Sequence, residues 1–466
     1  MHSRSVHWFR HDLRLRDNAA LAAAAEADEL IALFVLDDAL LEGSRSGAPR
    51  VRFLLASLEQ LAKDLEARGS RLVVRRGDPA SEIARLLDET KADRLCFGRS
   101  YAPAALRRDE RVRAVATKRG VRVVETRDHV VFESRDVLSQ QDRPFAVFTP
   151  YRRAWLRAFE AEPQIPLRAP KLPPTPAGVD SLPLPPSPAS PIELPVAGEA
   201  AAARRLSRFL ERSVADYARS RDFPAEDATS RLSPHLRFGT ISARTCVHLA
   251  REIAAIDPKA ARGANKWIDE LLWREFYCAI LKENPHVTRS SHRSEYDAIE
   301  WNDDEEGFRA WCEGRTGYPI VDAGMRQLAT TGWMHNRVRM IAASFLTKDL
   351  LVDWRRGEEF FYRSLIDGDP ASNNGGWQWA ASTGTDAQPY FRIFNPVSQG
   401  ERFDPAGRYV RRFVPELEDV GDRFVQRPWE APSPPRDYPA PIVSHHERRV
   451  QALRRYEAAR ERGGRS

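Results

Sequence analysis

Leu30-Ile31-Ala32-Leu33-Phe34-Val35-Leu36 is one of five short apolar runs in the first 130 residues. The other four lie at residues 6–9, 72–74, 95–97 and 121–124. Amphipathic stretches of helical length separate the runs, near residues 18–28, 50–68, 79–90 and 105–118. This alternation predicts a doubly wound parallel sheet in a Rossmann-like α/β domain, with its ligand site at the carboxyl ends of the strands. No G-x-G-x-x-G motif follows the first run, so the sequence does not support an ordinary nicotinamide site.

A change of composition separates this region from the rest of the chain. Twelve of the 33 prolines lie between residues 163 and 195, which predicts a surface connector because proline neither continues a helix nor joins a sheet interior. The pattern then becomes helical, with helices expected at 199–219, 242–255, 264–283, 305–313, 319–331, 334–350 and 357–366, and a solvent-facing closing helix at 443–462. We predict an N-terminal α/β domain at 1–130, a connector at 131–198 and an all-helical domain at 199–466.

Composition and charge restrict the class of protein. The chain has 72 Lys+Arg against 66 Asp+Glu, a net charge of +6 that is too diffuse to identify a partner. Its apolar runs fall far short of the roughly 20 residues that span a bilayer, and the first residues do not resemble a signal peptide. The four cysteines form no C-x-x-C pair, which argues against a zinc site or a disulfide framework. We expect a soluble cytoplasmic protein with no metal site and no membrane partner.

The tryptophans are concentrated, since eight of the eleven lie between residues 267 and 379. Such a cluster is either an aromatic core or a stacking or redox site. In the helix expected at 264–283, three- and four-residue spacing places four mixed side chains on one face: Glu270, Trp273, Arg274 and Tyr277. This face is either a solvated surface or a place where a partner stacks on the aromatic rings.

Two further stretches carry unusual polar groups. Asn336 and Met340 lie one helical turn apart with arginines beside them, and Asp369-Pro370 is typical of an N-cap followed by a first helical residue.

Six motifs, at 9–18, 229–233, 270–277, 316–322, 332–337 and 367–379, together resemble the photolyase/cryptochrome family. They include Glu270-Leu271-Leu272-Trp273-Arg274-Glu275-Phe276-Tyr277 and follow the family's order over nearly the whole chain. The chain is most similar to the class I cyclobutane pyrimidine dimer photolyases.

The resemblance implies an N-terminal α/β domain, a long connector and a C-terminal helical domain that binds FAD. Residues expected to bind the cofactor are Tyr217, Thr229, Ser230, Arg231, Leu232, Ser233, Arg274, Arg339, Asp367, Gly368, Asp369 and Asn373. Small hydroxyl side chains and backbone N–H groups near a helix start suit the FAD phosphates, although the same residues could form a plain capping turn. Arg339 is expected to pair with Asp367. Asn373 is expected to face flavin N5 and to favour the reduced anionic form.

The resemblance also implies a pocket for a flipped-out dimer. The residues expected to contact the lesion or the flanking phosphates are Arg221, Glu270, Trp273, Arg274, Tyr277, Asn336, Arg337, Met340, Trp379, Arg392 and Gln399. Trp273 and Trp379 would stack on the flipped bases, and Glu270 would hydrogen-bond a pyrimidine carbonyl that gains charge. In this family, enzymes for the (6-4) photoproduct use histidines around positions 336 and 340. This chain has Asn336 and Met340 there, so the resemblance implies a cyclobutane dimer as the substrate.

Three tryptophans match the family's electron-transfer chain, namely Trp377, Trp354 and Trp301, and packing is the expected role of Trp267, Trp311 and Trp333. The loop at residues 100–109 lacks the Asn-Glu pair of folate-binding members. A deazaflavin or flavin antenna is therefore expected over folate, in the cleft near Arg10 and Phe34, or no antenna at all.

These implications converge on light-driven repair of cyclobutane pyrimidine dimers, in which excited reduced FAD gives an electron to the dimer. The expected enzyme is a deoxyribodipyrimidine photo-lyase that works as a monomer on dimer-containing DNA, in the cytoplasm and at the nucleoid. A cryptochrome-like blue-light photoreceptor without repair activity is the alternative. An unrelated flavoprotein oxidoreductase would need a hydride site for its substrate, and the sequence shows none.

Overall fold

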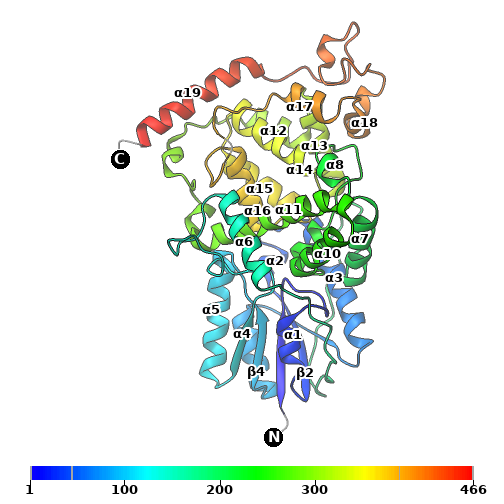
Figure 1. Cartoon of the computed structure of the whole chain (residues 1–466), viewed down its shortest axis with the longest axis vertical. Coiled ribbons are helices and arrows are strands. Elements are labelled where there is room, and N and C mark those ends of the chain that lie inside the picture. The colour runs from blue at the N-terminus through cyan, green and yellow to red at the C-terminus, as the bar shows by residue number, and fades with distance from the viewer. Residues whose placement is uncertain (1–2, 44–45, 388, 464–466) are drawn as a thin grey trace. The chain divides into compact units, whose positions relative to one another are not determined.

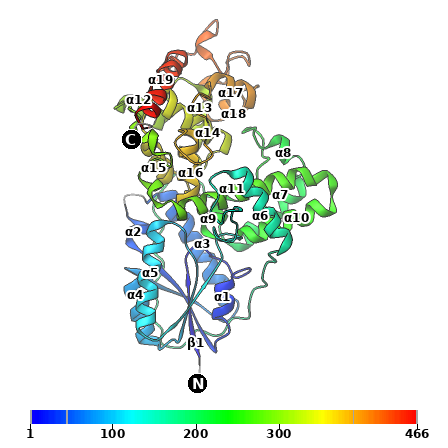
Figure 2. The ribbon, with the colours of Figure 1, turned by 60° about the vertical axis from the view of Figure 1, so that its left-hand side comes forward.

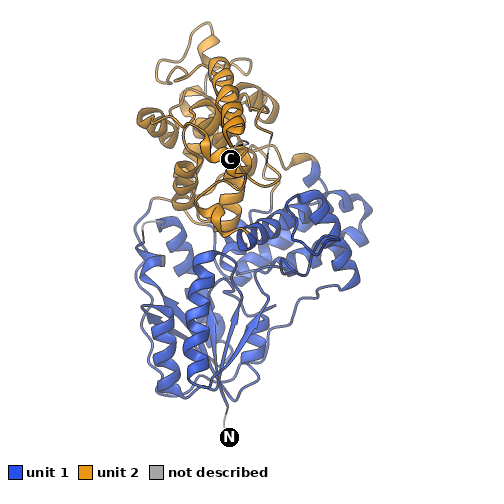
Figure 3. Ribbon diagram, turned by 90° about the vertical axis from the view of Figure 1, so that its left-hand side faces the viewer, with its two compact units in different colours: residues 1–190, 195–218, 230–283 blue, residues 191–194, 219–229, 284–466 orange. Residues whose placement is uncertain are grey.

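The computed structural model describes residues 3–43, 46–387 and 389–463, shown from two sides in Figures 1 and 2. Its contacts divide the chain into two compact units (Figure 3). Unit 1 comprises residues 1–190, 195–218 and 230–283, and unit 2 comprises residues 191–194, 219–229 and 284–466. The domain boundaries expected at residues 130 and 198 stay a prediction.

Unit 1 contains a five-stranded parallel sheet in the order β3-β2-β1-β4-β5. The strands are β1 Arg4–Phe9, β2 Glu29–Leu36, β3 Leu72–Arg76, β4 Arg94–Gly98 and β5 Arg122–Thr126. Each one grows from an apolar run of the sequence, and in β2 every residue after Glu29 is buried, as expected for a sheet covered on both faces. The strand order reverses between β1 and β4, where open α/β sheets form their ligand crevice. The predicted doubly wound sheet is confirmed.

The helices of unit 1 are α1 Ala19–Ala24, α2 Asp38–Leu41, α3 Ala48–Glu66, α4 Pro79–Thr90, α5 Pro103–Lys118, α6 Phe148–Ala161, α7 Glu199–Arg212, α9 Ser233–Phe238, α10 Ala243–Ile256 and α11 Pro258–Glu283. Helices α4 and α5 cover one face of the sheet and α1 covers the other (Figure 2). The short helix α8 Tyr217–Ser220 spans the division between the units. Helix α6 lies inside the stretch 131–198 that the sequence analysis assigned to the connector, before its proline-rich part. Its buried residues recur at helical spacing, so the signal was present in the sequence.

The proline-rich connector has no regular secondary structure between residues 163 and 198. It follows the sheet by backbone hydrogen bonds, since Leu30 donates to the Pro174 carbonyl at 3.0 Å and Leu182 donates to the Val74 carbonyl at 2.9 Å. Val74 is in the edge strand β3, and Leu30 precedes Ala32, where the pairing of β2 with β3 begins. The two contacts therefore satisfy backbone groups that no neighbouring strand reaches. The segment has the irregular backbone expected of a proline-rich stretch, and its role as an interdomain connector stays a prediction.

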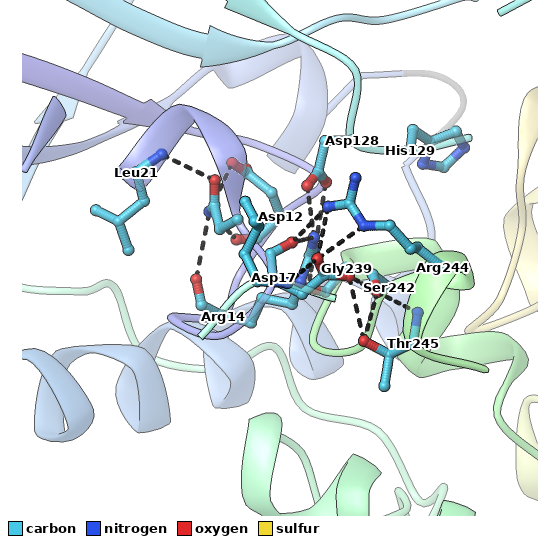
Figure 4. Close-up of polar contacts among 12 residues, drawn as sticks. Asp12, Arg14, Asp17, Leu21, Asp128, His129, Gly239, Ser242, Arg244 and Thr245 are labelled. Atoms are coloured by element: carbon cyan, nitrogen blue, oxygen red, sulfur yellow. Dashed lines mark hydrogen bonds and ion pairs between the residues drawn. The ribbon is translucent and has the colours of Figure 1, made fainter. Parts of the chain in front are cut away.

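Buried ion pairs join the sheet of unit 1 to its later helices (Figure 4). Asp17 has a left-handed backbone with φ of 54°, and its carboxylate accepts from Arg244 at 2.6 Å and from the Ser242 hydroxyl. Arg14 pairs with Asp128 at 2.5 Å, and both side chains are at most 3% exposed. A buried charge is tolerated only when it is paired and hydrogen-bonded. The 9–18 motif therefore fastens the end of β1 to α10.

Unit 2 is helical, as predicted. Its elements are α12 Glu305–Glu313, α13 Pro319–Thr331, α14 Asn336–Ser344, α15 Trp354–Ser364, α16 Pro370–Ala380, α17 Pro396–Phe403, α18 Arg408–Phe413 and α19 His445–Gly463, with a π-helical turn at Phe345–Asp349 and short 3-10 turns at Pro285–Thr288, Ser294–Ala298, Pro415–Leu417 and Pro428–Glu430. The helix expected at 334–350 thus ends in a π turn. Helix α19 is not purely solvent-facing, because Ala452, Tyr456 and Ala459 form a fully buried seam along it.

Within the described residues, no helix is long and apolar enough to cross a membrane, and no group of three His, Cys, Asp or Glu side chains could hold a metal.

Replacing Asp17 with Asn should lower the stability of unit 1. The substitution keeps a residue that tolerates the left-handed backbone but leaves the buried Arg244 without its carboxylate, a loss of about 3–5 kcal/mol. Urea unfolding followed by circular dichroism measures the change. Asp88→Asn is the control, because the Asp88–Arg119 pair is on the surface and such pairs contribute little. Equal effects of the two substitutions would contradict the role given to Asp17.

Candidate functional site

Helix α11 carries the mixed face expected from the sequence. Glu270, Trp273 and Tyr277 are half-buried, whereas Ile268 and Leu272 on other parts of the helix surface are 1% exposed. The Glu270 carboxylate lies 3.4 Å from the Lys266 ammonium and keeps 26% of its side-chain surface. The face is therefore neither a core stripe nor a fully solvated one.

Trp273 is held from behind by an aromatic ring that the sequence analysis missed. The Phe148 ring, at the start of α6, stacks on the indole with centroids 3.8 Å apart and planes at 10°. Phe148 is 7% exposed. Because one face of the indole is covered, only the opposite face can stack on another flat group.

Arg274 is hydrogen-bonded within unit 1. Its guanidinium donates to the His129 carbonyl at 2.7 Å and reaches the His129 ring at 2.8 Å. Burial, together with Arg274 itself, holds the pKa of His129 well below its ordinary value, so the neutral ring has one nitrogen that can accept from the guanidinium. The cofactor and phosphate contacts expected of Arg274 from the sequence stay a prediction.

Glu275, which the sequence analysis did not single out, fixes α11 inside unit 1. Its carboxylate accepts from the backbone N–H groups of Val131 and Phe132 at 2.6 and 3.0 Å, and from the Trp155 indole at 2.5 Å. Burial raises the pKa of Glu275, and these donors oppose the shift. The donors lie more than 100 residues away in the sequence, so no local pattern reveals them.

The loop expected to hold the cofactor phosphates is a hydroxyl-rich turn. In its unit 1 part, Arg231 has a left-handed φ of 49°, and Ser230 Oγ accepts from the Leu232 N–H at 3.4 Å. Leu232 is buried and Ser233 is exposed at the start of α9. Tyr217 is 6% exposed and packs edge-on against Phe209.

In unit 2, the expected Arg339–Asp367 ion pair is present. The guanidinium donates to both carboxylate oxygens, at 2.8 and 3.1 Å, and it also bonds the Met334 carbonyl. Gly368 is buried in the same turn. Asp369 caps α16 by accepting from Ala371 and Ser372 N–H, as the sequence predicted.

Asn373 on α16 has a fixed orientation. Its amide nitrogen donates to the backbone carbonyl of Glu358 at 2.8 Å and to the Glu358 carboxylate at 3.0 Å. Both donor hydrogens are therefore engaged by α15, and the amide oxygen remains as a hydrogen-bond acceptor.

The three tryptophans of the expected electron-transfer chain all belong to unit 2. Trp377 and Trp354 are 2% and 1% exposed, and Trp301 is half-buried with its ring edge-on to Tyr456 at 6.2 Å. In the described part of the chain, the indole N–H groups of Trp377 and Trp354 have no hydrogen-bond partner. Trp267 and Trp311 are buried, as expected of packing residues.

The residues expected to hold DNA in unit 2 are only partly gathered. Arg337 pairs with Asp222 at 2.9 Å, and Arg221 lies 3.7 Å from the same carboxylate. Asn336 and Met340 are in contact one turn apart, with Nδ2 and Sδ separated by 3.8 Å. Arg392 is exposed, and Gln399 and Trp379 are half-buried.

A pocket lies at the carboxyl ends of β1 and β2 in unit 1, where the sequence analysis expected a cleft near Arg10 and Phe34. Its lining combines aromatic and basic side chains, among them Trp8, Phe34, Phe238, Arg10, Arg50, Arg108 and Arg237. Arg10 and Arg108 share Asp109, at 2.5 and 2.8 Å. Burial and the neighbouring Arg10 lower the pKa of Arg108 to about 10, so an anion entering this pocket would relieve charge crowding.

The sheet of unit 1 and the tryptophan-bearing helices of unit 2 are the architecture of the flavin-binding photolyase/cryptochrome class. The family described as "DNA photolyase" matches residues 5–174, and the one described as "FAD binding domain of DNA photolyase" matches residues 267–458. The chain belongs to the DNA photolyase family and contains its FAD-binding domain.

Relatives cover the chain from end to end. A curated Halobacterium salinarum protein named deoxyribodipyrimidine photo-lyase is 42% identical, covering 97% of this chain and 98% of its own. A class III photolyase structure from Agrobacterium tumefaciens has a TM-score of 0.92 at 38% identity, covering 99% and 98% of the two chains. The structure of an archaeal photolyase from Sulfolobus tokodaii with two FAD molecules has a TM-score of 0.83 at 35% identity, covering 98% of this chain and 100% of its own. The structure of a Synechocystis cryptochrome has a TM-score of 0.89 at 28% identity, covering 97% of this chain and 99% of its own.

Proposed function

We propose that the protein is a light-driven DNA repair lyase that splits cyclobutane pyrimidine dimers and uses FAD as its cofactor. The observation that carries this function is the full-length match at 42% identity to a deoxyribodipyrimidine photo-lyase. The cryptochrome-like photoreceptor stays the alternative, and the lower identity of the cryptochrome structure, 28%, favours repair.

The residues present fit a flavin. When bound, reduced FAD supplies the excited-state electron that opens the cyclobutane ring and receives it back afterwards. Arg339 and Asp367 would hold the cofactor beside α16, and Ser230 and its neighbours would hold the phosphates. Because Glu358 engages both amide hydrogens of Asn373, the amide oxygen is the group left to accept a hydrogen bond. An acceptor at flavin N5 favours the reduced ring, whose N5 carries a hydrogen, over the oxidised ring.

The lesion contacts follow from the α11 face. A dimer already weakens its own stacking and pairing, so flipping it out of the duplex costs only a few kcal/mol. Trp273 can stack on a base only with the indole face that Phe148 does not cover, and each base stacked on an aromatic ring gains about 1–3 kcal/mol. The resemblance also assigns lesion contacts to Trp379, Asn336 and Met340 of unit 2.

Glu270 would stabilise the charge that develops on the dimer. Its carboxyl is half-buried at the edge of the aromatic face and has Lys266 one turn away. A protonated or proton-sharing carboxyl can donate to a pyrimidine carbonyl as that oxygen becomes negative, which is the principle of an oxyanion hole.

Phosphate contacts would come from Arg221, Arg337 and Arg392, with Gln399 nearby. Such contacts position a strand without reading its sequence, which suits an enzyme that finds a lesion anywhere. Asp222 holds two of these guanidiniums in place. Binding should therefore weaken as salt rises.

Trp377, Trp354 and Trp301 would pass electrons toward the flavin to reduce it. Indole is among the easiest side chains to oxidise, and its oxidised form is far more acidic than the neutral ring. Because the buried N–H groups of Trp377 and Trp354 lack a partner within the described residues, no protein group is poised to take their proton. The electron vacancy can then move on to the next ring.

We place a second chromophore in the unit 1 pocket. Aromatic walls suit a flat ring, and the basic side chains suit an anionic substituent. These features fit a flavin or deazaflavin nucleotide, in line with the Sulfolobus tokodaii photolyase that carries two FAD molecules. The loop at residues 100–109 lacks the Asn-Glu pair of folate-binding members, which disfavours a folate.

Illumination should reverse dimers in a single-turnover assay. The purified protein, chemically reduced, is mixed with an oligonucleotide that carries one thymine dimer and is exposed to near-ultraviolet light. Restored thymines are expected with wild type and not in the dark. Glu270→Ala should lower repair per absorbed photon far more than it lowers DNA affinity, and Asp88→Ala, at a surface ion pair away from α11, is the control. Tight FAD binding without any repair would favour the photoreceptor instead.

Phe148→Leu should weaken recognition of the lesion. Leucine keeps apolar contact of similar volume but loses the flat surface behind Trp273, and a stacked aromatic pair contributes about 0.5–1.5 kcal/mol beyond area burial. Affinity for dimer-containing DNA should fall up to about tenfold, with affinity for undamaged DNA unchanged. Titrations with both duplexes measure the two values, and equal losses would mean that Phe148 only supports the fold.

The bound chromophores can be identified directly. Absorption of the purified protein, followed by heat release and mass spectrometry, should yield FAD and a second anionic aromatic molecule. Arg108→Leu should reduce the content of the second chromophore while FAD is retained. Loss of both together would place the effect in the fold rather than in the pocket.

A further inference from the structure

Helix α15 contains a glycine where helices disfavour one. Gly357 lies in the second turn of Trp354–Ser364 and is buried, and glycine in a helix interior is destabilising because of its backbone freedom. Its neighbours give the reason for the missing side chain. A Cβ at residue 357 would lie 2.1 Å from Cη2 and 2.4 Å from Cζ3 of Trp377, and 2.6 Å from Cδ2 of Leu346.

Neither neighbour has room to retreat. Trp377 is 2% exposed and its ring is edge-on to Phe361 at 5.0 Å and to Trp311 at 6.0 Å. Leu346 is fully buried. The benzene edge of the Trp377 indole therefore packs directly against the backbone of α15 at Gly357, a position that we call the Trp377 seat. An added methyl group would displace the ring from this seat.

The same helix positions the other groups assigned to the flavin side of unit 2. Trp354, Gly357 and Phe361 recur at three- and four-residue spacing and so share one face of α15. The adjacent Glu358 fixes the Asn373 amide. One helical face thus carries one indole of the electron-transfer chain, seats the next and orients the amide.

We propose that Gly357 is a positioning residue for Trp377 and thereby controls photoreduction of the flavin. The inference rests on the proposed redox role of Trp377. Electron transfer between aromatic rings falls steeply with their separation and orientation, so a displaced indole slows it without any change in the chemistry of the ring.

Gly357→Ala tests the proposal. The photoreduction rate of the oxidised holoenzyme under blue light should fall several-fold, because the displaced indole no longer keeps the native distance and orientation to its neighbours. Repair by the chemically reduced enzyme should change much less. Gly376→Ala is the matched control, because Gly376 adjoins Trp377 in sequence and a Cβ there meets nothing within 4 Å. A wild-type photoreduction rate in Gly357→Ala, alongside a loss in Trp377→Phe, would overturn the inference.

Stability gives a readout that does not depend on redox function. Gly357→Ala should lower the unfolding midpoint, because the added methyl group meets the Trp377 indole. If the indole did not pack there, the substitution would raise the midpoint, since alanine is the better helix former. The loss should shrink in a Trp377→Phe background, because phenylalanine lacks the far edge of the indole. If Gly357→Ala does not fold, recovery of folding on addition of Trp377→Phe supports the packing of the indole on Gly357. Failure of both variants to fold overturns it.

The two proposals fail in different ways. If Trp377→Phe photoreduces at the wild-type rate, the redox role of Trp377 is wrong and its control by Gly357 falls with it. The stability comparison would still decide whether Gly357 seats the ring. Suppose that Trp377→Phe restores the stability lost in Gly357→Ala, but Gly357→Ala itself photoreduces normally. The packing contact between Gly357 and Trp377 would then stand, and its effect on electron transfer would be rejected.

Discussion

The buried Glu275 carboxylate is the contact on which the α11 face depends. It accepts from the backbone of the 131–132 segment and from the Trp155 indole of α6, groups 120 to 144 residues away in the sequence. An unpaired buried carboxylate would be strongly destabilising, so α11 cannot rotate without losing these donors. The orientation of the neighbouring Trp273, and its stack on Phe148, follow from that constraint.

Unit 2 obtains rigidity by a different route. The side chains assigned to its site project from α14, α15 and α16 or from the turn before α16. They are held by packing, by the Asn373–Glu358 hydrogen bonds and by single ion pairs such as Arg339–Asp367. Sites built on packed helices hold their groups more rigidly than sites built on loops. Such rigidity suits the electron transfer proposed for these tryptophans, which depends on fixed distances between the rings.

Local periodicity predicted the sheet, most helices and the mixed face of α11, because each of these depends on residues close together in the chain. The Arg339–Asp367 pair and the Asp369 cap were also foreseen. The Arg274–His129 contact and the Glu275 donors were not, because they join segments more than 100 residues apart. Helix α6 has buried residues at helical spacing, so its sequence pattern allowed it to be predicted. Arg274 shows the limit of a motif: its position in the sequence indicates a ligand contact but not the internal histidine that the guanidinium also contacts.

The tryptophans show how structure separates roles that sequence leaves equal. Trp311 donates its N–H to the Ala342 carbonyl at 3.0 Å, and Trp155 donates to Glu275, so in these two residues the polar edge is used to hold the fold. Trp377 and Trp354 are equally buried, yet in the described part of the chain their N–H groups bond to nothing. A packing residue gains stability from satisfying a buried donor. Leaving two donors unsatisfied is unfavourable for folding, and it is understandable if these rings must lose an electron without losing a proton.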